Sequence, residues 1–336
     1  MTSPSADVLG YEKSIFDAGL HFARPAFTFQ TSQWEPLAKE TLSATSWGYI
    51  HGNCGSGSTY RNNLTAFSRW SIVPNRLVPS RRDEDGNEQF ADTSTTVLGQ
   101  KLPFPLAIAP IGVQKIFNPE GEAATARAAA SLGVPYTLST ASSTSIEDVA
   151  AANGKDAPRW FQLYWPSREH DDITISMLNR AKASGYTALF VTLDTYVLGW
   201  RPSDLDNGYN PFIHPDHIGV EIGLTDPVFQ KKFKEKHGYD ITDAASGVYQ
   251  AAQGGSAGAS LGDAAREWAK IAIALGAKCV LVGRPYAYGL ALGGEDGVRH
   301  VLRALCGDLT MNMHLAGLRD IGEVNRDILV KESDLV

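Results

Sequence analysis

Short apolar segments recur along this chain at intervals of one strand and one helix, and this spacing constrains the fold more than any other feature. Four of them begin at Phe104, Val134, Arg159 and Ala188, and a fifth begins at Lys278. Continuous apolar runs of this kind are typical of strands that are buried on both faces of a parallel sheet. The three intervals between the first four starts are close to the ~31 residues per unit of an eight-stranded α/β barrel, so the spacing favours a TIM (β/α)8-type barrel.

The segments between these strands have helical composition and end in glycine. The stretches ATARAAASLG, NRAKASG and AKIAIALG end at Gly133, Gly185 and Gly276. Glycine readily adopts the left-handed conformation that ends a helix. No GxGxxG follows the first strand, which disfavours a dinucleotide-binding fold.

The barrel spacing fails after the fourth strand. Residues 201–243 form a polar excursion that contains prolines and a charged helix, FQKKFKEKHG. The remaining stretch, 244–270, leaves room for roughly one βα unit before the last strand. We therefore expect a barrel about two βα units short. The chain is expected to form one domain over 1–336, with an N-terminal helical lead-in over 1–100 and an abbreviated barrel over 101–325.

Composition restricts the function classes. The net charge of −7 and the pI near 5.6 argue against nucleic-acid binding, which needs a basic face. No signal peptide, membrane span or peroxisomal C-terminal tripeptide is recognised, so we expect a cytoplasmic protein that acts on a small molecule without contacting a membrane. The three cysteines form no CxxC motif, which predicts neither a disulfide framework nor a metal site.

Two strand ends carry polar side chains where barrel active sites form, at the carboxyl ends of the strands. Gln162 and Tyr164 end FQLYW, and Thr192, Asp194 and Arg201 lie in VTLDTYVLGWR. On the residues alone, two readings remain open. In the first, these side chains are functional. In the second, Gln162 and Thr192 are hydrogen-bonded polar residues of the barrel interior, Asp194 caps the next element, and Arg201 is a surface arginine.

Six ordered motifs closely resemble the FMN-dependent 2-hydroxy acid oxidase and dehydrogenase family. They are SWGYIHGNCGSGSTYRNNLTAFSRW, FPLAIAPIGVQ, TLSTASSTSIEDVA, RWFQLYW, TLDTYVLGWR and ALGAKCVLVGRPYAYGLALGGEDGVRHVL. Within the family, WRPSDLDNGY and PFIH are most similar to the lactate 2-monooxygenase branch and its fungal relatives. The resemblance implies FMN as cofactor, a small 2-hydroxy acid as substrate and a homo-oligomer.

The resemblance also implies which residues contact the cofactor. The backbone of Pro110, Ile111 and Gly112, after the first strand, would lie against the flavin ring. The side chains of Ser139, Gln162 and Thr192 would hydrogen-bond this ring. Gly283 and Arg284 would hold the phosphate.

On the substrate side, Tyr49 and Tyr164 match two hydroxyls that face the 2-hydroxy acid, and Arg201 matches an arginine that binds its carboxylate. Asp194 matches the carboxylate that orients the catalytic histidine. One departure inside this motif is Tyr196, which stands at a position where the family usually has proline.

Other family motifs are missing from the chain. The family's catalytic histidine and a second substrate arginine lie in an SNHGGRQ segment, a flavin lysine lies in LKG, and a DSGVR segment grips the phosphate. This sequence contains none of the three. The stretch GVYQAAQGGSAGASL aligns with the histidine segment and places Gln253 at the histidine and Ser256 at the arginine. Alternatively, this stretch is low-complexity sequence that spans a deletion.

A glutamine cannot act as a general base near neutral pH. His214 and His217, on the excursion, are conceivable substitutes. The sequence therefore predicts an FMN-dependent oxidoreductase that converts a 2-hydroxy acid to a 2-oxo acid. The alternative is a catalytically impaired homologue or truncated gene product that acts through association.

Overall fold

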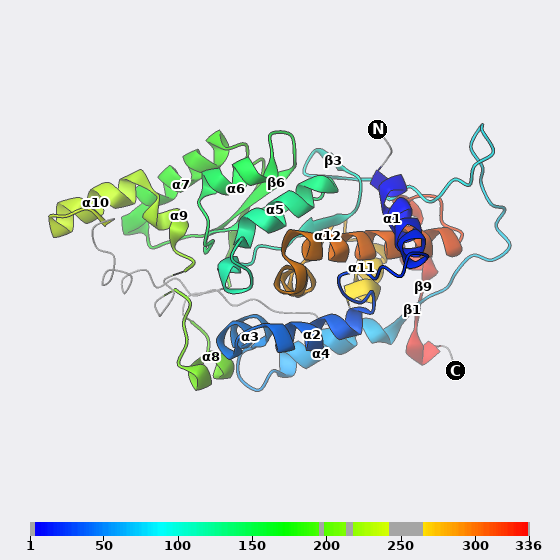
Figure 1. The fold of residues 1–336 in the computed structure, drawn as a ribbon, viewed down its shortest axis with the longest axis horizontal. Coiled ribbons are helices and arrows are strands. Elements are labelled where there is room, and N and C mark those ends of the chain that lie inside the picture. The colour runs from blue at the N-terminus through cyan, green and yellow to red at the C-terminus, as the bar shows by residue number, and fades with distance from the viewer. Residues whose placement is uncertain (1–3, 195–197, 213–217, 242–264, 335–336) are drawn as a thin grey trace.

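The computed structural model describes residues 4–194, 198–212, 218–241 and 265–334, which Figure 1 shows as a ribbon. Its main sheet has five parallel strands in the order β7-β6-β5-β4-β8. The strands are β4 (Leu106–Ile108), β5 (Tyr136–Ser139), β6 (Arg159–Tyr164), β7 (Leu189–Thr192) and β8 (Val280–Val282). Each lies inside one of the five segments predicted from the sequence, so the parallel sheet of an incomplete barrel is confirmed.

The last strand of this sheet pairs with the first. β8 lies beside β4, with Leu106 opposite Val280 and Ile108 opposite Val282. This pairing is the one that closes a (β/α)8 barrel, in which strand eight returns to strand one. The described sheet therefore corresponds to barrel strands one to four and strand eight.

Helices cover the outer face of the sheet, where Phe161 and Leu163 of β6 are buried in the main core. They are α5 (Gly121–Ser131), α6 (Ile146–Asn153), α7 (Asp171–Ala183), α11 (Ala265–Ala274) and α12 (Arg284–Leu315), which is kinked at Gly293 and Gly294. As predicted, Gly133 and Gly185 follow α5 and α7 in the left-handed region, with φ of +65° and +79°. Side chains with a Cβ rarely adopt this conformation, which explains why the helices end there.

The inner face of the sheet has its own small core. Ala107 and Trp160 pack there with Leu102, and Phe190 and Leu281 contact them. Leu102 belongs to a hairpin of β2 (Thr95–Val97) and β3 (Gln100–Leu102), which covers the amino ends of the strands. Because side chains alternate between faces along a strand, Ser139, Gln162, Tyr164 and Thr192 also belong to the inner face.

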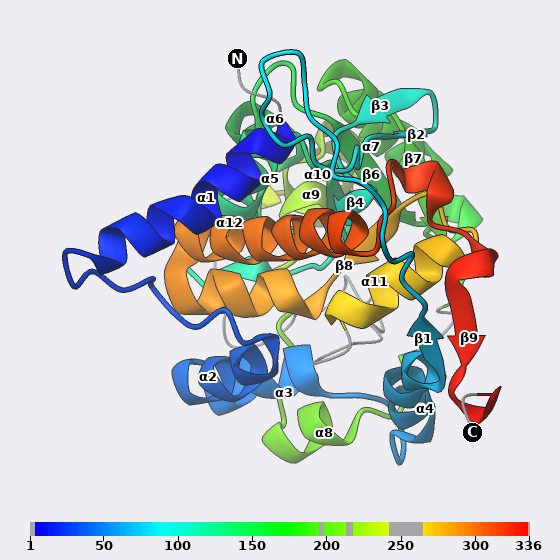
Figure 2. The same cartoon turned by 90° about the vertical axis from the view of Figure 1, so that its right-hand side faces the viewer.

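The N-terminal part of the chain packs on α12. It contains α1 (Pro4–Gly19), α2 (Trp34–Thr41), α3 (Ala44–His51), α4 (Ser58–Ala66) and β1 (Trp70–Ile72). Figure 2 shows α1 lying across α12, and β1 pairs antiparallel with β9 (Leu329–Lys331) near the C-terminus. Short 3₁₀ turns lie at Thr31–Gln33, Phe67–Arg69, Gln114–Ile116, Arg168–His170, Ile321–Glu323, Arg326–Ile328 and Glu332–Asp334.

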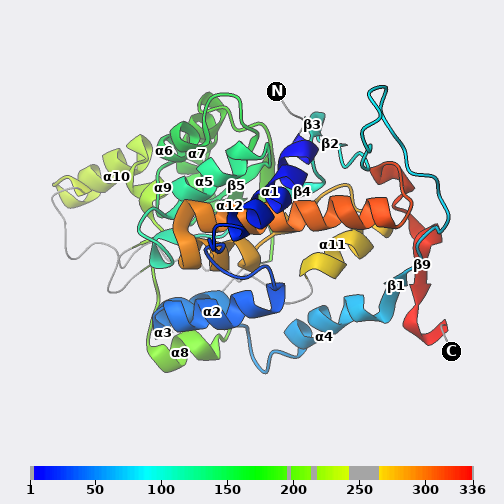
Figure 3. The same cartoon turned by 45° about the vertical axis from the view of Figure 1, so that its right-hand side comes forward.

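The described part of the excursion after β7 contains α8 (Pro202–Asn207), α9 (Glu221–Leu224) and α10 (Pro227–His237). α10 is the predicted charged helix, and the buried Asp226 caps it by accepting from the backbone N–H groups of Val228 and Phe229. α8 turns away from α10 and lies beside α3, as Figures 1 and 3 both show. Among the described helices, none is long and apolar enough to cross a membrane.

The outer face of β7 is less well covered than that of β6. Leu189 and Val191 are 45% and 39% exposed, whereas Phe161 and Leu163 on the neighbouring strand are buried. Within the described ranges, β7 and β8 each have a strand neighbour on one side only. As far as the described residues go, the sheet therefore has two open edges, which a complete barrel lacks.

Candidate active site

Three predicted cofactor residues form a hydrogen-bonded row across the carboxyl ends of β5, β6 and β7. Ser139 Oγ donates to Gln162 Oε1 at 3.2 Å, and Gln162 Nε2 donates to Thr192 Oγ1 at 2.8 Å. Ser139 and Gln162 are buried, and Thr192 is partly exposed. The structure therefore brings together an amide and two hydroxyls at the end of a barrel where active sites form.

Thr140 joins this row, although the sequence analysis did not single it out. Its backbone N–H donates to Gln162 Oε1 at 3.2 Å, and its hydroxyl donates to the Gln162 carbonyl at 2.5 Å. The same hydroxyl accepts from the backbone N–H of Tyr164 at 3.1 Å. Thr140 thus locks the ends of β5 and β6 together and fixes the direction of the Gln162 side chain.

The turn after β4, which carries Pro110, Ile111 and Gly112, is tightly packed and strained. A Cβ on Gly112 would lie 2.6 Å from the carbonyl oxygen of Ala141, so this position admits only glycine without a backbone shift. The next residue, Val113, is fully buried with φ of +51°, which is rare for a β-branched residue. Its N–H donates to the Ala141 carbonyl at 2.9 Å, and this contact holds the turn against the end of β5.

The two helices α3 and α8 bring Tyr49 and Arg201 together. The Arg201 guanidinium lies over the Tyr49 ring at 5.1 Å, and its Nη2 donates to the Tyr49 carbonyl at 3.2 Å. Arg201 is only 8% exposed, so it is not a surface arginine. Its Nε lies 2.6 Å from Oδ2 of Asp204, another residue that the sequence analysis missed. Burial raises the pKa of the Asp204 carboxyl, and the charge of Arg201 opposes this rise.

Arg284, at the start of α12, is buried beside the end of α3. Its Nη2 donates to the carbonyls of His51 and Gly52 at 3.0 Å each, and its guanidinium lies 5.7 Å from the centre of the Tyr60 ring. Its buried Nε has no hydrogen-bond partner among the described residues. Burial also lowers the pKa of Arg284. A buried guanidinium with an unpaired N–H is suited to bind an anion such as a phosphate.

The remaining predicted residues also lie at or just beyond strand and helix ends. Tyr164 ends β6, and Asp194 is exposed two residues beyond β7. Gly283 is the N-cap of α12, directly before Arg284. The roles of all three remain predictions. Tyr196, His214, His217, Gln253 and Ser256 lie outside the described residues.

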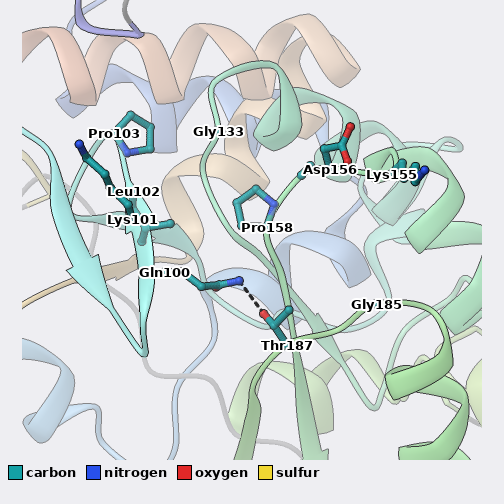
Figure 4. A pocket seen from close by; sticks show the side chains of 11 residues that line it. Gln100, Lys101, Leu102, Pro103, Gly133, Lys155, Asp156, Pro158, Gly185 and Thr187 are labelled. Carbon is teal, nitrogen blue, oxygen red and sulfur yellow. Dashed lines mark hydrogen bonds between the residues drawn. The ribbon is translucent and has the colours of Figure 1, made fainter.

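A cavity of about 440 Å³ lies at the opposite end of the sheet, among residues that precede β5, β6 and β7 (Figure 4). Gln100, which lines the cavity, bridges two neighbouring residues. Its Nε2 donates to Thr187 Oγ1 at 2.9 Å, and its Oε1 accepts from Trp160 Nε1 at 2.8 Å. In barrels this end contributes to stability and not to catalysis. The cavity is therefore distinct from the candidate active site.

Comparison with known proteins identifies the family. A model of the FMN-dependent dehydrogenase family matches residues 38–272 and 269–331. The chain belongs to this family. An FMN-dependent alpha-hydroxy acid dehydrogenase of Schizosaccharomyces pombe is 44% identical, over 96% of this chain and 97% of the relative. A protein of the same description from Penicillium citrinum is 36% identical, over 97% and 96%. A crystal structure of mandelate oxidase with (S)-2-phenylpropionate superimposes with a TM-score of 0.70 at 27% identity, covering 91% of this chain and 99% of that one.

Membership of the FMN-dependent dehydrogenase family makes FMN the cofactor of this chain and 2-hydroxy acid oxidation its class of reaction. The residues present fit FMN on two grounds. The unpaired Nε of the buried Arg284 suits a phosphate, and the row from Ser139 to Thr192 offers donors and acceptors to a flavin ring. When bound, FMN supplies a two-electron acceptor.

Proposed function

We propose that this chain binds FMN and a small 2-hydroxy acid at the carboxyl end of its sheet, and that its turnover is limited by the loss of the family's general base. The observation that carries the proposal is the pairing of Tyr49 with the buried Arg201. Tyr49 packs against the cluster that contains Val113 and Ala141, which follow β4 and β5, so the pair lies at the same end of the sheet as the Ser139, Gln162 and Thr192 row. This pairing places a cation and a phenol together, which suits the carboxylate and the hydroxyl of one substrate.

In this proposal, the chain's own residues bind and orient the reactants. Arg201 binds the substrate carboxylate, and the hydroxyls of Tyr49 and Tyr164 face the substrate hydroxyl. Pro110, Ile111, Gly112, Ser139, Gln162 and Thr192 contact the flavin ring, and Gly283 and Arg284 hold the phosphate. In total the acid loses two protons, one from the α-carbon and one from the hydroxyl, and two electrons, which pass to bound FMN, and it becomes a 2-oxo acid.

The base step is where this chain differs from the family. Asp194 matches the carboxylate that orients a histidine, but the alignment places Gln253 at the histidine and Ser256 at the second arginine. An amide does not accept a proton near neutral pH, and general base catalysis typically contributes about 10²–10⁴-fold to the rate. Turnover should therefore be slow, although binding is retained.

An internal deletion gives one explanation for the missing motifs. The alignment with the S. pombe relative extends over 402 positions, whereas this chain has only 336 residues. The alignment includes 97% of the relative's residues. Unmatched positions of the relative therefore lie inside the aligned region. Together with the open edges at β7 and β8, this supports a chain that lacks barrel units, which favours the alternative of a catalytically impaired protein or a truncated gene product.

The visible spectrum of the purified chain, reconstituted with FMN, tests the proposal. We expect bound flavin whose absorbance bleaches slowly when (S)-mandelate or L-lactate is added under nitrogen. An Arg201→Met variant should retain the flavin and lose the response to the acid. If the chain holds no FMN, the proposal is wrong, and the truncated product is the better description.

Two further properties belong to this proposal. A homo-oligomer is expected from the family resemblance, and sedimentation velocity of the FMN-loaded chain would detect it. A cytoplasmic location is expected from the sequence, and imaging of a tagged chain would test it.

A further inference from the structure

Asp204 is the acidic residue that contacts the candidate substrate arginine. Its Oδ2 lies 2.6 Å from Arg201 Nε, and the two side chains are 18% and 9% exposed. This is a partly buried ion pair, which water screens less than an ion pair on the surface.

The backbone fixes this contact. Arg201 is the N-cap of α8, Pro202 is its first helical residue, and Asp204 follows in the first turn. The Arg201 carbonyl accepts from the backbone N–H of Leu205 at 3.1 Å, which closes this turn. Residues three apart on a helical turn lie on the same side, so the side chains of Arg201 and Asp204 meet.

The packing of α8 against α3 then places the Arg201 side chain beside Tyr49. A Cβ on Gly48 would lie 2.8 Å from the side-chain nitrogen of Asn207, and one on Gly52 would lie 3.3 Å from the Ser203 Cβ. The two helices therefore approach closely at glycines. The Arg201 guanidinium is held on two sides in this interface, by Asp204 at Nε and by the Tyr49 carbonyl at Nη2.

We propose that Asp204 is a positioning residue of the substrate site, whose carboxylate holds the Arg201 guanidinium over Tyr49 in the orientation that receives the substrate carboxylate. This inference rests on the proposed function, because it takes Arg201 as the substrate-binding group. Asp204 itself touches neither the substrate nor the flavin in this scheme. It acts through Arg201, by restricting the rotamers of a long side chain before the ligand arrives.

Ligand binding to the FMN-loaded chain provides the first test, with benzoylformate as the probe. The flavin absorbance change gives its Kd for the wild type, Asp204→Leu, Asp204→Glu, Arg201→Met and the double variant Arg201→Met/Asp204→Leu. Asp204→Leu should weaken benzoylformate roughly tenfold, the scale of one charge-assisted hydrogen bond, with FMN affinity unchanged. Asp204→Glu should recover most of the loss. The control is Asp206→Leu, an exposed residue on the same helix, which should bind as the wild type does.

The double variant separates positioning from a general structural role. If Asp204 acts only through Arg201, Asp204→Leu adds no further loss in the Arg201→Met background. An equal loss in both backgrounds would overturn the inference.

A measurement without ligand separates this inference from the proposed function. In a chain with ¹⁵N-labelled arginine, the Nε–H signal of Arg201 is identified by its disappearance in Arg201→Lys. We expect its exchange with water to accelerate at least tenfold in Asp204→Leu but not in Asp204→Glu, since the carboxylate protects this N–H. Unchanged exchange in Asp204→Leu would overturn the inference. If exchange responds but Arg201→Met still binds benzoylformate normally, Asp204 positions the arginine and the proposed substrate role of Arg201 is wrong.

Discussion

Arg159 donates from Nη1 to the carbonyl oxygen of Ser184 at 2.9 Å, and this contact ties the beginning of β6 to the end of α7. The same guanidinium reaches the end of α6, because its Nε donates to Asn153 Oδ1 at 3.1 Å and its Nη2 donates to the Lys155 carbonyl at 3.2 Å. Arg159 is only 5% exposed. A buried cation thus satisfies carbonyls where two helices end, the position at which a positive charge is most favourable.

Replacing Arg159 should therefore destabilise the incomplete barrel. In Arg159→Met several buried carbonyls lose their donor, and we expect the free energy of unfolding to fall by about 2–4 kcal/mol. Urea unfolding followed by tryptophan fluorescence would measure the loss. Arg168→Met, at an exposed arginine, is the control and should change stability by less than about 0.5 kcal/mol. A similar effect in both variants would show that the Arg159 contacts contribute little.

Arg284 should determine FMN affinity. In Arg284→Met the phosphate loses a charge-assisted partner, and we expect FMN to bind about 10- to 100-fold more weakly. The quenching of FMN fluorescence on binding gives the Kd. Because Arg284 also holds the carbonyls of His51 and Gly52, a thermal unfolding curve of the variant without FMN must accompany the measurement. If affinity for FMN stays unchanged while the fold is intact, the phosphate is bound elsewhere.

A histidine at position 253 should increase turnover if the alignment of GVYQAAQGG is correct. Gln253→His would restore a group that accepts a proton near neutral pH, and general base catalysis contributes about 10²–10⁴-fold. Stopped-flow bleaching of the bound flavin by (S)-mandelate is the measurement, and Gln250→His is the matched control. Equal rates for both variants and the wild type would favour the interpretation that this stretch spans a deletion.

The ion pair between Arg180 and Glu147 predicts a pH dependence of stability. Arg180 Nε and Nη2 donate to the two Glu147 oxygens at 2.9 and 2.8 Å, and these bonds lower the Glu147 pKa below its usual 4.5. A carboxyl whose pKa is lower in the folded state stabilises the fold above its unfolded pKa. This contribution is lost as the pH falls through the folded value.

We therefore expect the urea midpoint of the wild type to fall below about pH 4.5, and to fall less steeply in Glu147→Gln. The variant should also be less stable than the wild type at neutral pH, because Arg180 loses its ion pair with Glu147 and keeps its neutral contacts with the Ile222 carbonyl and the Thr225 hydroxyl and its contact with Asp226. Glu84→Gln, at an exposed loop position, is the control. If the urea midpoints of Glu147→Gln and the wild type change with pH in parallel, the ion pair with Arg180 does not cause the acid loss of stability.

The sheet could be predicted from the sequence because its strands are apolar on both faces and are followed by polar residues at one end. Gln162 and Thr192 could be singled out because polar side chains at the carboxyl ends of such strands lie where barrel active sites form. Thr140 was not, since it is one of several hydroxyl residues in TLSTASSTS and only the strand register selects it. Asp204 was missed because it lies among other polar residues in SDLDN, and only the turn of α8 brings it to Arg201.

The two open edges of the sheet belong to strands that are consecutive in the described chain, β7 and β8. These edges therefore lie on either side of the place where we propose the internal deletion, and no described strand pairing would have to change for the barrel to be completed. If the proposed internal deletion is correct, one contiguous block of sequence, inserted at a single junction between α10 and α11, would suffice to supply the further barrel units. A chain lengthened at that one junction would keep every described element in place, so the proposed deletion can be tested by a single insertion.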